Sequence, residues 1–126
     1  MNGRKTVVDF LIMNGANVNS EDRIHQTPLH LATEKNHMEV VELLIAKKAR
    51  VNSVDIHGRT PLHYAAKNGN LQIVKILVNN GAFLTIKDYQ NQTPCQIASN
   101  VLYNSYNKAV DDYLKEVEEK LRRGHQ

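Results

Sequence analysis

The sequence predicts an all-α protein in which similar helix-turn-helix units are stacked into a solenoid. One hexapeptide occurs three times, as TPLHLA at residues 27–32, TPLHYA at 60–65 and TPCQIA at 93–98, and the stride is 33 residues both times. Apolar residues follow the same stride, and within each unit they fall at the spacing of one buried helical face. A fixed period of this length indicates a supersecondary unit that repeats along the chain.

The first unit, residues 3–21, is expected to be a half repeat. Gly3 aligns with Asn36 and Gly69, so the chain opens at the second helix of a unit whose first helix and Thr-Pro motif are missing. Because the terminal units of a solenoid need a polar outer face, we expect this uncovered apolar end either to continue a longer array or to meet a partner. Self-association is one contact that would cover it.

Two full units, residues 22–54 and 55–87, follow the half repeat. Thr27, Thr60 and Thr93 each precede a proline. A threonine hydroxyl can accept a hydrogen bond from the free amides of a helix start, and proline suits the first helical position because no amide donor is needed there. These pairs therefore predict the start of the first helix in each unit.

Residues that tolerate a left-handed backbone mark the helix ends. Asn36 and Gly69 are predicted to separate the two helices of a unit, and Gly15 and Gly81 to end the second helix. Lys48 occupies the place between those two glycines, where a left-handed backbone costs a lysine about 1 kcal/mol. The sequence therefore predicts a local weak spot at Lys48.

The last unit, residues 88–126, is predicted to cap the stack with a long helix over 105–123. Its apolar residues fall at helical spacing on one side, and they are Tyr106, Val110, Tyr113, Leu114, Val117 and Leu121. The remainder is predicted to form a solvated face, made of Lys108, Asp111, Asp112, Lys115, Glu116, Glu118, Glu119, Lys120, Arg122 and Arg123. We treat residues 1–126 as a single domain.

The motif T-P-L-H-x-A at a period of 33 residues resembles that of the ankyrin-repeat family, and the resemblance covers the chain from end to end. It implies that β-hairpin loops protrude between the units. Gly58 lies at the tip of the middle loop, whereas His25 and Asn91 replace glycine in the flanking loops. We expect those two tips to differ in shape from the middle one.

The histidines and the cysteine do not form a catalytic or metal-binding motif. By the resemblance, His30 and His63 tie adjacent repeats together by hydrogen bonds to a threonine hydroxyl and a backbone group. His25 and His57, near the loop tips, would make only a weak metal site without a third ligand. Cys95 is expected to be a buried, unreactive thiol. We therefore predict neither enzymatic activity nor a cofactor.

Composition limits the classes of partner and compartment. The net charge of +3 comes from 16 basic and 13 acidic residues whose signs are interspersed. Nucleic-acid binding normally needs a clustered basic stripe, so nucleic acid is not an expected partner. No apolar run approaches the length of a membrane-spanning helix, and no membrane association is expected. A single cysteine fits a reducing compartment, and we predict an intracellular, cytoplasmic protein.

The resemblance implies that partners bind to the hairpin tips and to the concave, exposed face of the first helices. Ile24, Ile56 and Tyr89 are large apolar residues on this strip, and basic residues flank them. In such an arrangement a few side chains can dominate binding. The predicted partner-binding residues are Arg23, Ile24, Gln26, Lys35, Ile56, His57, Arg59, Lys67, Tyr89 and Gln90.

The predicted function is protein–protein interaction with a partner that the sequence does not identify. The alternatives are a structural spacer or scaffold segment of a larger multi-domain protein, and the recognition part of a bacterial effector or ligase adaptor. Asn19 and Asn52 follow second helices, where by the resemblance they are candidates for asparaginyl hydroxylation. The simpler interpretation is that they hydrogen-bond the hairpin backbone, as asparagine does in turns.

Overall fold

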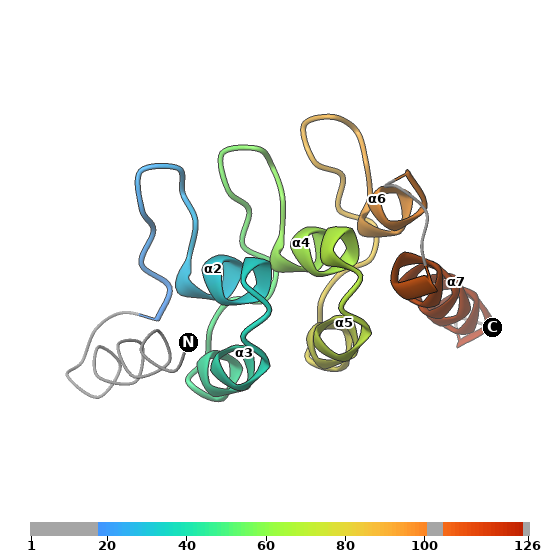
Figure 1. Ribbon diagram of the computed structural model, residues 1–126, viewed down its shortest axis with the longest axis horizontal. Coiled ribbons are helices and arrows are strands. Elements are labelled where there is room, and N and C mark those ends of the chain that lie inside the picture. Colours follow the sequence, from blue (N-terminus) through green and yellow to red (C-terminus); the bar gives the residue numbers. More distant parts are fainter. Residues whose placement is uncertain (1–17, 101–104, 125–126) are drawn as a thin grey trace.

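The computed structural model describes residues 18–100 and 105–124, and within these ranges the chain forms six α-helices and no β-strand. The first helices are α2 (Pro28–Glu34), α4 (Pro61–Asn68) and α6 (Pro94–Asn100); the second helices are α3 (Met38–Ala46), α5 (Leu71–Asn79) and the long α7 (Ser105–Gly124). Figure 1 shows the first helices in one row, α3 and α5 in a row beneath them, and the connecting loops rising above. The predicted all-α solenoid is confirmed.

The first helices begin where the Thr-Pro motifs predict. Each has its proline in the first turn, and a side chain three residues after the threonine accepts a hydrogen bond from the threonine amide. These bonds run from Thr27 to His30 Nδ1 at 3.1 Å, from Thr60 to His63 Nδ1 at 3.0 Å and from Thr93 to Gln96 Oε1 at 2.9 Å. The predicted caps are present at Thr27 and Thr93, whose hydroxyl oxygens accept from the amides of His30 and Gln96 at 3.4 and 3.2 Å, and the Thr60 hydroxyl lies 2.9 Å from His63 Nδ1.

Left-handed backbone conformations occur at the predicted helix ends. The φ angles of Asn36, Gly69 and Gly81 are 61°, 71° and 96°, and that of Lys48 is 76°. Lys48 therefore adopts the conformation that L-residues with a long side chain disfavour. Gly15 lies outside the described residues.

The three loop tips have the same backbone conformation, contrary to the prediction that the flanking tips would differ. The φ angles of His25, Gly58 and Asn91 are 60°, 72° and 67°. Asparagine and histidine reach the left-handed region more readily than most residues do. In all three loops, moreover, the tip amide donates to the carbonyl of an aspartate three residues earlier, so one turn geometry is imposed on all.

The hydrophobic core runs continuously between the two rows of helices. Ala65 and Ala98, which occupy the same motif position in successive units, are fully buried, and α4 contacts both α2 and α6. A methyl side chain lets these helices approach closely. The largest buried apolar residues are Leu29, Val40, Val41, Leu44, Leu62, Ile73, Val74, Leu77, Val110 and Leu114.

Helix α7 buries only part of the apolar side that the sequence predicts. Val110 and Leu114 are 0% and 1% exposed, whereas Tyr106 and Leu121 are 72% and 54% exposed. The contacts of α7 are with α4, α5 and α6. The helix therefore closes the stack with its middle turns, while apolar residues near its two ends face solvent.

Asp111 was predicted on the solvated face of α7, and this prediction is wrong. The side chain is buried against α6, where its Oδ1 accepts from Cys95 Sγ at 3.3 Å, and its Oδ2 pairs with Lys115 Nζ at 3.0 Å. Asn107, one turn earlier, is also buried. The packed face of α7 is thus wider and more polar than its hydrophobic residues alone indicate.

The predicted half repeat, residues 3–21, lies mostly outside the described residues. Its second helix and any self-association through its apolar end therefore stay predictions.

Candidate functional site

Each protruding loop is a tight turn held by an aspartate. In the middle loop the Asp55 amide donates to Arg59 O at 3.0 Å, and Asp55 Oδ1 accepts from the amides of His57 and Arg59 at 2.9 and 3.1 Å. Asp22 and Asp88 repeat this pattern in the flanking loops. A carboxylate that accepts hydrogen bonds from two backbone amides holds the turn in place without the hydrogen bonds of a β-ladder.

Neighbouring loops are joined to one another at their tips. The Ile56 amide donates to Ile24 O at 3.0 Å, and the Tyr89 amide donates to His57 O at 3.0 Å. Arg59 Nε also pairs with Asp88 Oδ2 at 3.3 Å. The three tips therefore form one connected edge along the top of the molecule (Figure 1). We call residues 23–24, 56–57 and 89–90 the hairpin ridge.

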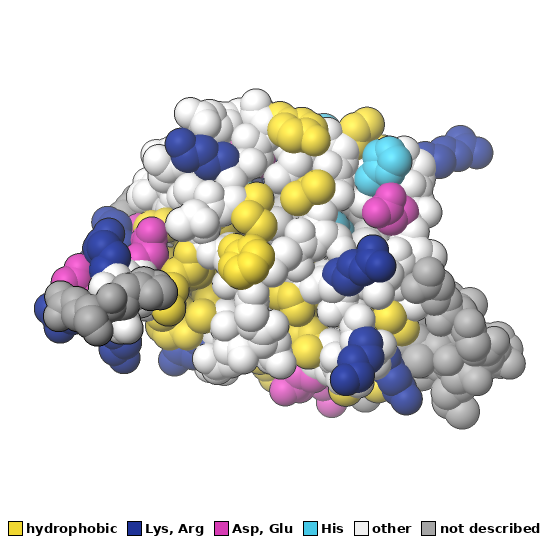
Figure 2. Space-filling model, turned by 180° about the vertical axis from the view of Figure 1, so that it is seen from behind, with side chains coloured by type: hydrophobic (Ala, Val, Ile, Leu, Met, Phe, Trp, Pro, Cys, Tyr) yellow, Lys and Arg dark blue, Asp and Glu magenta, His cyan; other side chains and the backbone are white. Residues whose placement is uncertain are grey.

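The hairpin ridge presents large apolar side chains to solvent. Ile24, Ile56 and Tyr89 are 42%, 48% and 76% exposed. The Tyr89 ring lies against Gly58, where an added Cβ would come within 2.7 Å of it. Figure 2, seen from behind, shows hydrophobic side chains at the upper edge, over the loops. Because Gly58 has no side chain, the Tyr89 ring can pack directly against the tip of the neighbouring loop.

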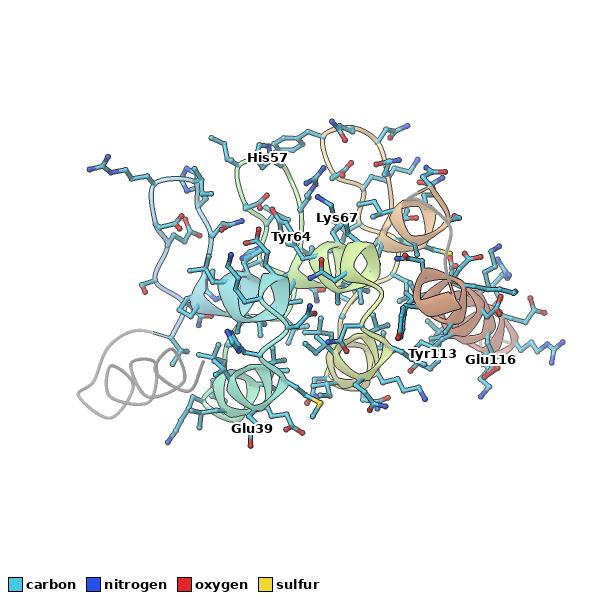
Figure 3. The ribbon with its side chains drawn as sticks, in the orientation of Figure 1. Glu39, His57, Tyr64, Lys67, Tyr113 and Glu116 are labelled. Carbon is cyan, nitrogen blue, oxygen red and sulfur yellow. The ribbon has the colours of Figure 1, made fainter. Side chains whose placement is uncertain are left out.

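Basic side chains lie beside the ridge, but they are not equally available. Arg23, Lys35 and Lys67 are exposed. Figure 3 places His57 at the tip of the second loop and Lys67 on α4 below it. Arg59 is only half-exposed because it pairs with Asp88 and donates to the exposed Gln90 side chain at 3.4 Å. The positive charge of Arg59 is therefore partly neutralised by Asp88 of the following unit.

Gln26 was predicted as a surface contact, and the structure corrects this. The residue is 6% exposed, and its Nε2 donates to Asp55 Oδ2 at 3.2 Å and to Tyr64 Oη at 3.1 Å. Both partners belong to the next unit, which covers Gln26. The other nine predicted residues are exposed or half-exposed.

Tyr64 completes this buried network, and the sequence analysis missed it. The residue fills the variable position of the motif, occupied by leucine and isoleucine in the other units, and its hydroxyl donates to Asp55 Oδ2. Burial raises the pKa of Tyr64 to about 12, and the Asp55 carboxylate adds to the rise. Burial opposes ionisation of Asp55, but bonds from Tyr64 and backbone amides outweigh it and lower its pKa. The sequence did contain a signal for this buried network: Tyr64 occupies a motif position that holds an apolar residue in the other two units.

His30 and His63 tie the repeats together, as predicted from the resemblance. Their Nε2 atoms donate to Arg59 O and Gln92 O in the next unit, both at 2.9 Å, while Nδ1 accepts from the threonine amide at the helix start. Burial lowers the pKa of both imidazoles, which outweighs the backbone carbonyls that favour the charged form. The rings are therefore neutral and structural.

Groups with potential reactivity are engaged in ordinary contacts. His25 Nδ1 lies 2.9 Å from Glu21 Oε1, and the described part of the chain contains no group of three His, Cys, Asp or Glu side chains that could hold a metal. Cys95 is half-buried rather than fully buried. Burial raises the pKa of its thiol to about 12, and the hydrogen bond to Asp111 adds to the rise. A thiol in this state is a poor nucleophile.

Asn19 and Asn52 both form hydrogen bonds to the backbone of the following unit. Asn52 Nδ2 donates to Gly81 O at 3.0 Å, and Asn52 Oδ1 accepts from the Phe83 amide at 2.9 Å. Asn19 Oδ1 accepts from the Arg50 amide at 2.7 Å. These asparagines therefore join consecutive units.

The comparisons with known proteins agree with this repeat geometry. A family model described as ankyrin repeats, in 3 copies, matches residues 1–88. No curated protein matches the chain. Within the described ranges, no helix has both the length and the apolar character needed to cross a membrane.

Proposed function

The chain belongs to the ankyrin-repeat family, and from this premise we propose that it binds a partner protein through the hairpin ridge and the neighbouring exposed face of the first helices. Ankyrin repeats are generally modules for protein–protein interaction and typically not enzymes. The proposal for this chain concerns which of its surfaces makes the contact.

The observation that carries the proposal is the row of exposed apolar side chains on a pre-ordered edge. Ile24, Ile56 and Tyr89 lie on consecutive loops whose tips are hydrogen-bonded to each other. Large apolar and aromatic side chains with polar surroundings are typical of the residues that dominate binding energy. Because the loops are already held in place, little conformational entropy is lost when a partner binds.

The charges beside the ridge support a partner with acidic residues. Arg23, Lys35 and Lys67 are exposed, and none of them has an ion-pair partner among the described residues. Exposed charges at an interface rim chiefly raise the association rate and favour one class of partner. We expect binding to weaken as salt concentration rises.

The experiment described below also tests two alternative functions. A spacer or scaffold segment would hold other domains in position and would not need the apolar ridge. A bacterial effector or ligase adaptor would use the ridge but differ in the partner it recruits. An intracellular location, expected from the single cysteine, is part of the proposal.

The test is affinity capture from a cell lysate with the wild-type chain and an Ile56→Ala, Tyr89→Ala variant, compared by quantitative mass spectrometry. A partner that the ridge recognises is held by the wild type, and the variant binds it more weakly by about 2 kcal/mol or more. Thermal unfolding of the variant should change little, because both side chains are exposed.

The matched control is Phe83→Ala, which removes a 62%-exposed aromatic side chain outside the ridge. It should capture the partner as the wild type does. Equal capture by all three proteins would move the contact elsewhere, and absence of any specific partner would favour the spacer function.

A further inference from the structure

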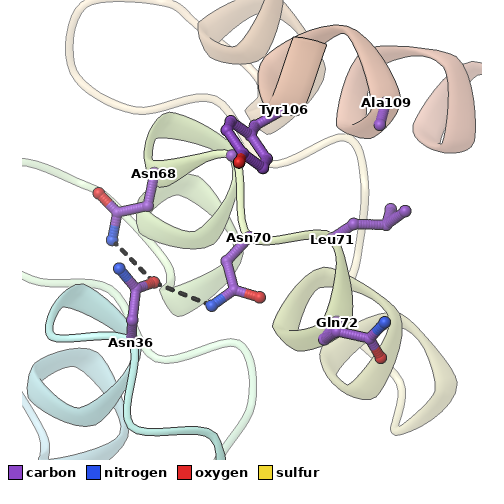
Figure 4. A pocket seen from close by; sticks show the side chains of 8 residues that line it. Asn36, Asn68, Asn70, Leu71, Gln72, Tyr106 and Ala109 are labelled. Carbon is purple, nitrogen blue, oxygen red and sulfur yellow. Dashed lines mark hydrogen bonds between the residues drawn. The ribbon is translucent and has the colours of Figure 1, made fainter.

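A pocket of about 530 Å³ lies away from the hairpin ridge, where the turns between first and second helices meet the start of α7. It is lined by one residue of the first turn, a run of the second turn and two residues of α7, namely Asn36, Asn68, Gly69, Asn70, Leu71, Gln72, Tyr106 and Ala109. Figure 4 shows the asparagines on one side, Leu71 and Gln72 on the other, and Tyr106 above them. None of these described lining residues carries a charge.

Three side-chain amides on one wall of the pocket are held by hydrogen bonds. Asn36 Oδ1 accepts from Asn70 Nδ2 at 3.1 Å and from Asn68 Nδ2 at 3.5 Å. Asn68 Nδ2 also donates to Glu34 O at 2.9 Å, and Asn70 Oδ1 accepts from the Ile73 amide at 3.1 Å. The row joins two consecutive repeats and is therefore pre-ordered.

The same row keeps unused hydrogen-bonding capacity. Asn36 Nδ2 and Asn68 Oδ1 have no protein partner among the described residues, and neither does the carboxamide of Gln72. A carboxamide offers two donor hydrogens and an acceptor oxygen. The rest of the lining is apolar, and the ring of Tyr106, 72% exposed, forms part of it. The pocket thus combines free donors, free acceptors and apolar surface without any charge.

We propose that this pocket binds a short, extended, uncharged peptide segment of a partner protein. The peptide's main-chain N–H and C=O groups pair with the carboxamides of Asn36, Asn68 and Gln72, and one apolar side chain packs against Tyr106 and Leu71. A charged ligand would lose hydration without gaining a counter-charge. A nucleotide would find no cation in the lining for its phosphate, and a sugar is a competing ligand that the test separates from a peptide.

The proposal does not depend on the hairpin ridge. Pockets of this volume are typical of ligand sites in which a few polar groups orient a mainly apolar ligand. Main-chain pairing supplies affinity, and the pocket for one side chain supplies selectivity.

The test is an NMR titration of the full ¹⁵N-labelled chain with acetyl-Ala-Leu-Ala-amide and its relatives with Phe or Glu in the centre. We expect saturable shifts of the side-chain amide signals of Asn36, Asn68 and Gln72 with the Leu and Phe peptides. The Glu peptide should bind about tenfold more weakly. Adenosine and methyl glucoside, as other uncharged ligands, should cause no saturable shift.

Two variants probe the two parts of the pocket. Asn36→Gly removes the carboxamide but keeps a residue suited to φ of 61°, and Tyr106→Ala removes the ring but keeps the Cβ that lies against Gly69. Each should weaken peptide binding by about fivefold or more. Asn79→Ala, which removes an exposed amide outside the pocket, should bind as the wild type does.

The proposal is overturned if no capped peptide gives a saturable shift, if the Glu peptide binds as well as the Leu peptide, or if the shifts map to the hairpin ridge. It is also overturned if adenosine or the glucoside binds better, or if Asn36→Gly, shown by its spectrum to be folded, binds the peptide unchanged.

Discussion

Single residues with positive φ decide where each helix and each loop tip turns. Asparagine, histidine and lysine take positions that glycine occupies in other units, at Asn36, His25, Asn91 and Lys48. For asparagine the cost is small because its side chain tolerates this region. For Lys48 no such compensation is present, so the residue should reduce stability.

Replacing Lys48 by glycine should therefore stabilise the fold by about 1 kcal/mol, measured as the free energy of unfolding in urea. The Lys48 carbonyl, which accepts from Asn19, is kept. The control is Lys47→Gly, at a neighbouring position with φ of −93°, where glycine should not stabilise. A gain in the free energy of unfolding at both positions would mean that relief of the left-handed backbone at Lys48 is not the cause.

The buried histidines make the fold sensitive to acid. Burial lowers the pKa of His30 and His63 below the ordinary 6.5, so below pH 6.5 the unfolded chain binds protons that the folded chain does not. The contribution of the two neutral histidines to the free energy of unfolding should be fully present above pH 6.5. It should fall as the pH drops toward the lowered pKa values. Asp55 and Asp88, whose pKa values are lowered from 3.8, should add a further loss as pH falls below that value.

A His30→Gln, His63→Gln variant tests this origin of the acid sensitivity. Gln96 makes the same bond to its threonine without titrating near neutrality, so the variant should be less stable but should lose little further stability between about pH 7 and pH 5. Thermal unfolding across that range is the measurement. An unchanged slope in the variant would assign the acid sensitivity to other groups.

At the scale of elements, the repeats are joined by bonds that recur with the same 33-residue stride. The asparagine after the second helix, the motif histidine and the loop-tip carbonyl each bind the following unit. Together with the alanine contacts between first helices, these bonds specify one register between units. The stability of such a stack is close to a sum of unit and interface contributions.

Asn52→Ala should weaken one such interface by about 1–3 kcal/mol, because it removes the bonds to Gly81 O and the Phe83 amide and leaves backbone groups less well satisfied. Urea unfolding measures the loss. Thr85, which aligns with Asn52 but is exposed, gives the control: Thr85→Ala should change stability by less than about 0.5 kcal/mol. Equal losses would argue against the interface role.

Helix α7 joins the stack through a polar residue as well as through its core residues. Asn107 aligns with Val74 and is buried, and its Nδ2 donates to Ala66 O and Lys67 O at 3.1 and 3.2 Å. These carbonyls belong to the last turn of α4, where the regular partners four residues ahead are missing, although Ala66 O also accepts from the Gly69 amide at 3.2 Å. The capping helix thus also caps α4.

At the scale of the whole molecule, the middle unit is the most completely covered by other described helices. Helix α4 contacts α2, α5, α6 and α7. Opening α4 therefore requires the loss of contacts on several sides. Amide hydrogen exchange should be slowest in α4, with α6 and the last turns of α7 faster. Uniform protection across these helices would contradict this and would indicate that the stack opens as one unit.

Much of the fold and part of the site could be predicted from the sequence. Helix starts, the 33-residue stride and the left-handed positions depend on neighbours close in sequence, so TPLHLA and its copies predict them directly. The exposure of Ile56 and Tyr89 followed from their place on a protruding loop. The burial of Gln26 could not be predicted, because its environment is supplied by Asp55 and Tyr64 in the next unit.

The sequence by itself determined the repeat, its helix boundaries and the residues that turn the chain, because short-range hydrogen bonds and backbone preferences control them. Only the tertiary structure decided which polar side chains become buried or free. Stacking the units covers Gln26, joins Asn52 to the next loop and buries Asp111, while it leaves the carboxamides around Asn36 open to solvent. Which surface the next unit covers is a property of packing, and no local pattern encodes it.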